Sequence, residues 1–289
     1  MIPLILLIVA IAIYLWCGVN LIVVSRFTVT SHKLPKSFDG YKIVQITDLH
    51  SKVFGHDNQW LIDKIDAIGP DSIVVTGDMM SDKNDDGQVF ERLAAVLVKR
   101  YPIYCISGNH EERVHHHDAN HIYADFRAKL INMGVHYIDN EKVRIARGGD
   151  SIDLYGLSIG LFFYRQNASK RSAGRYAFTK DKIAIKFGRL DESKFNLLLV
   201  HSPFYFDSYA TWGADLTFAG HVHGGVIRLP FVGGVFSPDK TFFTKYDAGL
   251  FDKGDSKMIV GRGLGTTHLN VRIFNQPEIV VVTLNTTDK

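Results

Sequence analysis

The sequence predicts an α/β fold, a sandwich of two sheets with helices on the outside. In the first half of the chain, apolar runs rich in Val, Ile and Leu alternate with stretches of helical periodicity, which is typical of a mostly parallel sheet. From Val143 onward the pattern changes to short strands separated by glycine, which indicates a second sheet packed against the first. With 289 residues, 46% of them hydrophobic and 22% charged, the chain can bury a full core.

The first 24 residues are predicted to be a transmembrane anchor. Residues 1–24 contain no charged side chain, and about 20 apolar residues suffice for a helix to cross a bilayer. A cleaved signal peptide would have a basic start and a small-residue cleavage site, which are not evident here. A buried core helix is the other alternative. Four basic residues follow the apolar segment: Arg26, Lys33, Lys36 and Lys42. The positive-inside tendency therefore predicts a single-pass protein with its domain in the cytoplasm.

The expected elements of the first sheet follow a polar linker. Residues 25–40 contain Pro35 and are predicted to be that linker, and residues 41–289 to be one domain. Apolar runs predict strands at 42–48, 72–78 and 103–108. Apolar residues at helical spacing predict helices at 57–68, 87–100 and 120–133, the last closed by Gly134. The second sheet is expected from the runs VRIA, IDLYGLSIG, MIVGRGLG and EIVVVTL.

Five apolar runs end in side chains that bind metal ions. KIVQIT leads to Asp48 and His50, SIVVT to Asp78, IYCIS to Asn109 and His110, NLLLV to His201, and LTFA to His221 and His223. Open α/β sheets hold their ligands at the carboxyl ends of the strands, so neighbouring strands would gather these side chains at one edge. Each motif alone is more often a loop, but their joint occurrence favours a site for a pair of divalent metal ions.

The types of side chain suit such a pair. Asp48 and His50 are two residues apart, so at a strand end they point to the same side and can chelate one ion. The Asp78 carboxylate has two oxygens and can bridge two ions, which lie roughly 3.5–4 Å apart in such sites. The other donors are an amide oxygen and three imidazoles: Asn109, His201, His221 and His223. This set favours Mn, Fe or Zn over Ca or Mg alone.

In this order the motifs resemble those of the calcineurin-like metallophosphoesterases. That family shares Asp-x-His, Gly-Asp, Gly-Asn-His-Asp/Glu, a lone His and Gly-His-x-His, and the resemblance covers residues 42–284. It implies a sandwich of two mixed β-sheets flanked by helices. It also implies a hydrolase with two divalent metal ions, Mn first and Zn or Fe as alternatives, in which a metal-bound hydroxide attacks a phosphoester or pyrophosphate bond.

The resemblance also implies residue roles. Asp48, His50 and His223 would hold the first metal, Asn109, His201 and His221 the second, and Asp78 would bridge both. His110 would be the catalytic residue, a general acid or charge stabiliser rather than a ligand.

One position departs from the family's pattern. Many members have a second Asp three residues after Gly-Asp that hydrogen-bonds the catalytic His, whereas here Ser81 takes that place and the carboxylate falls at Asp82. The segment also lacks the arginine that Ser/Thr protein phosphatases carry just after it, so a protein phosphatase is not expected.

The expected substrate is a phosphorylated small molecule or lipid. The anchor and the run GGVIRLP after His223 resemble the membrane-associated bacterial branch of the family, which is related to enzymes acting on lipid-linked pyrophosphates such as UDP-2,3-diacylglucosamine. Candidate substrate-binding residues are Arg165 and Arg171. A nucleotide phosphodiesterase of the same fold and a non-catalytic metal-binding scaffold are the alternatives. The net charge of +3 comes without a clustered basic stripe, so no nucleic-acid partner is expected.

Overall fold

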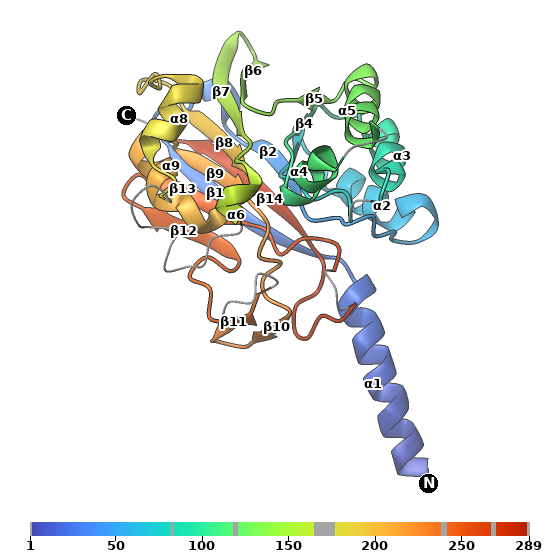
Figure 1. The fold of residues 1–289 in the computed structure, drawn as a ribbon. Helices are drawn as coiled ribbons and strands as arrows, with labels where there is room; N and C mark the ends of the chain where they lie inside the picture. The colour runs from blue at the N-terminus through green and yellow to red at the C-terminus, as the bar shows by residue number, and fades with distance from the viewer. Residues whose placement is uncertain are drawn as a thin grey trace.

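Two mixed sheets form the centre of the computed structural model, which describes residues 2–81, 84–117, 121–164, 177–237, 242–266 and 270–287 (Figure 1). The first six-stranded sheet has the order β1-β14-β2-β3-β4-β5, with only β14 and β2 paired antiparallel. Its strands are β1 (Val23–Ser31), β14 (Glu278–Thr286), β2 (Tyr41–Ile46), β3 (Ser72–Val75), β4 (Ile103–Cys105) and β5 (His136–Tyr137).

The second six-stranded sheet has the order β12-β13-β9-β8-β7-β6, and its two outer pairs are antiparallel. Its strands are β12 (Gly249–Lys253), β13 (Ser256–Val260), β9 (Leu216–Ala219), β8 (Asn196–Val200), β7 (Asp150–Leu157) and β6 (Glu141–Arg147). A small antiparallel pair, β10 (Ile227–Leu229) and β11 (Gly233–Phe236), stands apart from both. The expected sandwich of two mixed sheets is confirmed.

Helices cover the outer face of each sheet. The first sheet is covered by α2 (Gln59–Ile68), α3 (Gln88–Leu97) and α5 (Ile122–Asn132), and the second by α8 (Lys180–Phe187) and α9 (Phe206–Trp212). Val44 and Ile73 face the first group of helices, whereas their neighbours Ile43 and Val74 face the second sheet. Because both faces are buried, these strands are continuous apolar runs rather than alternating ones.

The short elements include one helix that the sequence pattern does not indicate. The helix α4 (Asn109–His116) begins directly after β4, and most of its side chains are polar, so it lacks an apolar stripe that would predict it. The other short elements are α6 (Leu161–Tyr164), η1 (Lys36–Phe38), η2 (His56–Asn58) and η4 (Pro203–Tyr205). The three expected helices of the first half correspond to α2, α3 and α5.

The segment predicted to be a linker contains a strand instead. β1 pairs in parallel with β14 along its whole length, from Val23 beside Glu278 to Ser31 beside Thr286. One face of β1 is exposed at Arg26, Thr28 and Thr30, so polar residues alternate with more buried ones and do not form an apolar run. The first sheet therefore begins at Val23, and only residues 32–40 connect it to β2.

Two expectations about strand neighbours were also wrong. The run EIVVVTL forms β14 in the first sheet, between β1 and β2, and not a strand of the second. The strands that lead to the five metal-binding motifs are divided between the sheets, with β2, β3 and β4 in one and β8 and β9 in the other. The motifs therefore meet across the sandwich and not along one edge. Sequence pattern marks a buried strand but does not say which sheet it joins.

The N-terminal helix α1 (Ile2–Asn20) projects from the body of the protein (Figure 1). It is long and apolar enough to cross a membrane, and only 11% of its most apolar stretch is buried. A core helix would be buried, so that alternative is excluded. Length and composition of this kind are also found in signal sequences.

Candidate metal centre

The two sheets meet at a buried polar cluster beyond the carboxyl ends of their central strands. Gln45, on β2, spans the sheets there: its side-chain amide donates to the hydroxyl of Thr76 at 2.9 Å and to the carbonyl of Ala219 at 2.8 Å. His201, beyond β8, crosses in the other direction, and its Nδ1 lies 2.7 Å from the carbonyl oxygen of Thr76. These contacts fix the ends of β3, β8 and β9 relative to one another.

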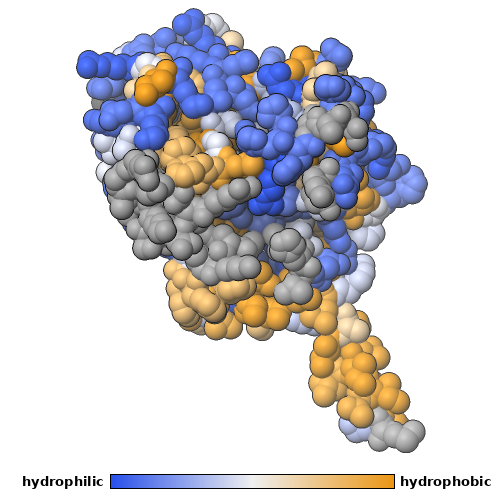
Figure 2. Space-filling view, viewed as in Figure 1, coloured by the Kyte–Doolittle hydropathy of each residue, from blue (hydrophilic) through white to orange (hydrophobic). Residues whose placement is uncertain are grey.

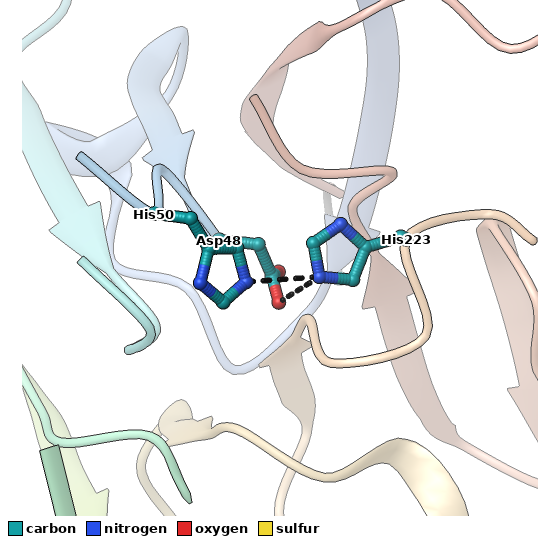
Figure 3. A group of neighbouring side chains, drawn as sticks. All are labelled: Asp48, His50 and His223. Atoms are coloured by element: carbon teal, nitrogen blue, oxygen red, sulfur yellow. Dashed lines mark hydrogen bonds and ion pairs between the residues drawn. The ribbon is translucent and has the colours of Figure 1, made fainter. Parts of the chain in front are cut away.

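The first group of candidate ligands contains Asp48, His50 and His223 (Figure 3). The Nε2 atom of His223 lies 3.2 Å from Oδ1 of Asp48 and 3.1 Å from Nε2 of His50. Two ligand atoms held about 2.1 Å from one ion at a tetrahedral angle would be about 3.4 Å apart. The three side chains come from two sheets and converge at a spacing that suits a shared cation.

The second group contains Asp78, His201 and His221. The Nε2 atom of His201 lies 3.1 Å from Oδ2 of Asp78 and 3.3 Å from Nδ1 of His221. The same Asp78 oxygen is 3.8 Å from Nε2 of His50, which belongs to the first group. Asp78 therefore lies between the two groups, the position that a bridging carboxylate requires.

Asn109 and His110 complete the cluster from the first turn of α4. Asn109 is buried, and among the described residues its side-chain oxygen has no hydrogen-bond partner. A buried amide oxygen without a partner is costly, so a cation at this place would satisfy it. His110 is oriented by its backbone N–H, which donates to Oδ1 of Asp78 at 2.8 Å, and its Nε2 lies 3.9 Å from the other Asp78 oxygen.

The backbone at these ligands adopts a conformation that non-glycine residues avoid. Five candidate ligands have φ between 46° and 74°: Asp48, His50, Asp78, His221 and His223. Each such residue costs of order 1–3 kcal/mol, and such strain concentrates at functional sites. It also explains why β2 and β3 end at Ile46 and Val75, before the expected 48 and 78, because a left-handed residue cannot continue a strand.

Burial and charge set the ionisation of the cluster. Burial lowers the pKa of His50 to about 3 and that of His223 well below its usual value, so both rings keep lone pairs for a cation. Burial would also lower the pKa of His201, but Asp78 and Asp48 raise it to about 9. Burial opposes ionisation of Asp78, yet His201 and the other nearby imidazoles hold its pKa well below the usual range. Burial dominates at Asp48, where it raises the pKa to about 6. In the metal-free protein a proton on His201 thus offsets carboxylate charge that a metal ion would otherwise neutralise.

Glu111 holds together the turn that follows β3 and the turn that follows β4. The motif alone does not reveal this role. The buried carboxylate of Glu111 accepts hydrogen bonds from the backbone N–H groups of Asp78 at 2.8 Å, Met80 at 2.9 Å and Gly108 at 2.8 Å. Gly77 and Gly108 make this possible, because a Cβ on Gly77 would lie 2.4 Å from the nitrogen of Gly108. The signal was present in the sequence, since Glu three residues after a helix N-cap is a capping pattern.

Replacing Glu111 with glutamine is expected to destabilise the protein by about 1–3 kcal/mol and to weaken metal binding. The amide has one acceptor oxygen, and its NH₂ group would face a backbone N–H. Urea unfolding in detergent and metal titration would measure both effects. Glu141→Gln is the matched control, because Glu141 is exposed and should change neither. Equal stability of the two variants would contradict the role assigned to Glu111.

Two further residues, Arg272 and Asn275, support His223 and were not predicted. The side-chain amide of Asn275 donates to the carbonyl of His223 at 2.7 Å and also to that of Gly225. The buried guanidinium of Arg272 donates to the carbonyls of Arg262 at 3.0 Å and Gly263 at 3.2 Å. They lie in an irregular segment far along the chain, where no motif marks them. The candidate substrate residues Arg165 and Arg171, and the carboxylate Asp82, lie outside the described residues.

The geometry agrees with comparisons with known proteins. Residues 41–225, well over half of the chain, match the calcineurin-like phosphoesterase family. The chain belongs to the calcineurin-like phosphoesterase family. It is 30% identical to an uncharacterized metallophosphoesterase, YkuE of Bacillus subtilis, over 93% of this chain and 87% of that protein.

Two further relatives cover most of the chain. An uncharacterized metallophosphoesterase of Aquifex aeolicus is 25% identical over 90% of this chain and 91% of its own. The phosphodiesterase YaeI of Escherichia coli is 27% identical over 84% of this chain and 82% of its own. Family and relatives support, in general terms, a metal-dependent phosphoester hydrolase.

Proposed function

We propose that the protein is a membrane-anchored phosphoesterase with a dinuclear metal centre that hydrolyses a phosphodiester or pyrophosphate bond. The observation that carries this proposal is the position of Asp78. One of its oxygens lies 3.1 Å from His201, 3.8 Å from His50 and 3.9 Å from His110, so a single carboxylate touches both candidate ligand groups and the candidate acid. Two divalent ions bound here would neutralise phosphate charge and activate water for attack on phosphorus.

The chain's own residues have three tasks in this proposal. Asp48, His50 and His223 would hold one ion, and Asn109, His201 and His221 would hold the other. Asp78 would be shared by both. Mn suits this mixture of carboxylate, amide and imidazole donors, with Zn or Fe as alternatives.

His110 acts on the substrate and not on the metals. Its side chain is 17% exposed, more than those of His50, His201 and His223, so it lies at the mouth of the cluster. Arg113, one turn further along α4, has an Nη1 3.4 Å from Nε2 of His110. From this position His110 can give a proton to the leaving-group oxygen or stabilise charge on phosphate.

We further propose an amphiphilic substrate presented at a membrane, such as a lipid-linked pyrophosphate of the UDP-2,3-diacylglucosamine type. An anchor in α1 would keep the centre close to the bilayer, and the basic residues after α1 favour a cytoplasmic domain. YaeI is described as a phosphodiesterase, which supports a bond of the diester class.

The function is tested by comparing substrates with the purified full chain in detergent. Bis(p-nitrophenyl) phosphate, a nucleotide and a UDP-linked lipid would be tried in parallel, each after EDTA treatment and again after addition of Mn. We expect hydrolysis of the aryl diester that EDTA abolishes and Mn restores, with the highest kcat/KM for the UDP-linked lipid. A chain that binds Mn and hydrolyses none of the three would favour a metal-binding scaffold. A preference for the nucleotide would redirect the proposal to a nucleotide phosphodiesterase.

A further inference from the structure

The helix α1 is joined to the body without a flexible segment. Only Leu21 and Ile22 separate it from β1, and Ile22 is buried in the core between the first sheet and its helices. The N–H of Leu21 donates to the carbonyl of Cys17 at 3.0 Å, and that of Val23 donates to the carbonyl of Pro277 at 2.9 Å. The direction of α1 is therefore set by the body.

The segment around residues 272–274 packs along the last turns of α1. Gly18 approaches it so closely that a Cβ there would lie 2.5 Å from the carbonyl oxygen of Arg272. Nearer the N-terminus of the helix, the hydroxyl of Tyr14 accepts a hydrogen bond from the N–H of Phe274 at 3.0 Å, and their rings are 5.6 Å apart. The body thus reaches past the end of α1 and along its side.

That contact places part of the body at membrane depth. Tyr14 precedes Asn20, the last residue of α1, by six residues, which is about 9 Å along a helix at roughly 1.5 Å per residue. Lys52, whose Nζ donates to Oδ1 of Asn20 at 3.1 Å, marks the polar end of the helix. If α1 spans the bilayer, Phe274 lies at a depth of about 5–10 Å, where amphipathic elements bury their apolar faces.

The surface beside Phe274 is apolar and exposed. It comprises Leu229, Phe231, Val232, Phe242, Phe243 and Phe274, here called the apolar lobe. Figure 2 shows hydrophobic residues gathered over β10 and β11, on the same side of the molecule as α1. Phe231 is fully exposed, and φ is 66° at Phe231, 51° at Phe243 and 51° at Phe274. Bulky residues rarely adopt such φ values, so the chain holds these rings outward at a cost.

We propose that the apolar lobe is a second membrane contact, which inserts its aromatic rings into the interface of the bilayer that α1 crosses. The proposal rests on the part of the proposed function that puts α1 in a membrane. A lipid surface fits because the six side chains of the lobe are apolar and exposed, and because Phe274 joins the lobe to Tyr14 of the anchor. Arg228, which precedes Leu229 on β10, is paired with Asp247, with Nη1 and Oδ2 2.9 Å apart.

Docking of the lobe would fix the height of the metal centre above the bilayer. Only Gly224, Gly225 and Val226 lie between His223 and β10. Asn275, next to Phe274 in the lobe, is hydrogen-bonded to the carbonyl of His223. The lobe is therefore tied closely to His223, which suits hydrolysis of a headgroup held at a constant distance from the membrane.

The test places a tryptophan in the lobe of the full chain reconstituted into vesicles. Phe231→Trp is made in a Trp16→Phe background, because Trp16 lies on α1 and would itself be quenched by lipid. Emission is compared in phosphatidylcholine and phosphatidylglycerol vesicles with and without acyl chains brominated near the carbonyl. Ile185→Trp in the same background is the matched control, since Ile185 is 85% exposed on α8, which lies at the opposite end of the molecule from α1.

We expect brominated lipid to lower the fluorescence contributed by the Trp introduced at position 231 by about twofold, as for a ring in the lipid interface. The fluorescence contributed by the Trp introduced at position 185 should not change. Equal quenching at the two positions would overturn the lobe contact. Emission at 231 that is blue-shifted without quenching would also overturn it and would point to a second copy of the chain on the lobe.

Two further measurements distinguish failure of the lobe contact from failure of the proposed function. They are flotation of the same vesicles and hydrolysis of a soluble diester. If the chain does not float with the vesicles, both the anchor and the lobe contact are contradicted. If the chain floats but the emission of the Trp at position 231 is not quenched, only the lobe contact is contradicted. Quenching without hydrolysis contradicts the enzymatic proposal and leaves the lobe contact supported.

Discussion

Replacing Asp78 with asparagine is expected to lower kcat/KM for a phosphodiester by about a thousandfold or more, with loss of at least one metal ion per chain. Asparagine preserves the volume but offers one oxygen and no charge, so it cannot bridge the two ligand groups that meet at Asp78. The loss of charge also removes the larger of the two carboxylate interactions that raise the pKa of His201 to about 9. Metal content by mass spectrometry and steady-state kinetics would measure the two effects together.

Asp86→Asn is the matched control, because Asp86 is an exposed carboxylate in the loop that follows the same turn. It should keep both ions and full activity. An Asp78→Asn variant that loses metal and retains turnover would show that the hydrolysis does not depend on this centre. A variant that keeps two ions would show that Asp78 does not bridge them.

Replacing His110 with glutamine is expected to lower kcat by about a hundredfold to ten-thousandfold while both metal ions remain bound. The side chain of His110 lies near Asp78 but is more exposed than those of His50, His201 and His223, so its loss should remove a proton donor and not a ligand. The effect should be larger for an alkyl leaving group than for p-nitrophenolate, because a good leaving group needs no proton. Rates with both types of diester would show whether His110 acts as a proton donor or stabilises charge on phosphate.

The control for His110 is His116→Gln, since His116 is exposed on the last turn of the same helix. It should leave kcat and metal content unchanged. If His110→Gln lost metal along with activity, His110 would be a ligand. If the loss of rate were the same for both leaving groups, His110 would stabilise phosphate charge and not act as an acid.

The fold was largely predictable because its central strands are buried on both faces. Runs such as SIVVT and NLLLV have no polar alternation, so both their strand character and their central position follow from sequence. β1 could not be found in this way, because an edge strand with one exposed face has the composition of a linker. The assignment of β8, β9 and β14 to their sheets depends on long-range packing, which periodicity does not encode.

Some residues of the candidate site are also predictable from sequence, whereas others are not. The proposed ligands lie shortly after buried strands, and the joint order of the motifs predicts them from sequence. Arg272 and Asn275 support His223 from an irregular segment with no pattern of its own, so only the structure identifies them. The left-handed backbone at Asp48 and Asp78 is likewise invisible in sequence, because neither residue is glycine.

The most direct test of the dinuclear centre is anomalous diffraction from crystals of the full chain grown with Mn. We expect two peaks roughly 3.5–4 Å apart, with Asp78 bridging them. Asp48, His50 and His223 would surround one peak, and Asn109, His201 and His221 the other. A single peak, or two peaks that do not share Asp78, would contradict this expectation.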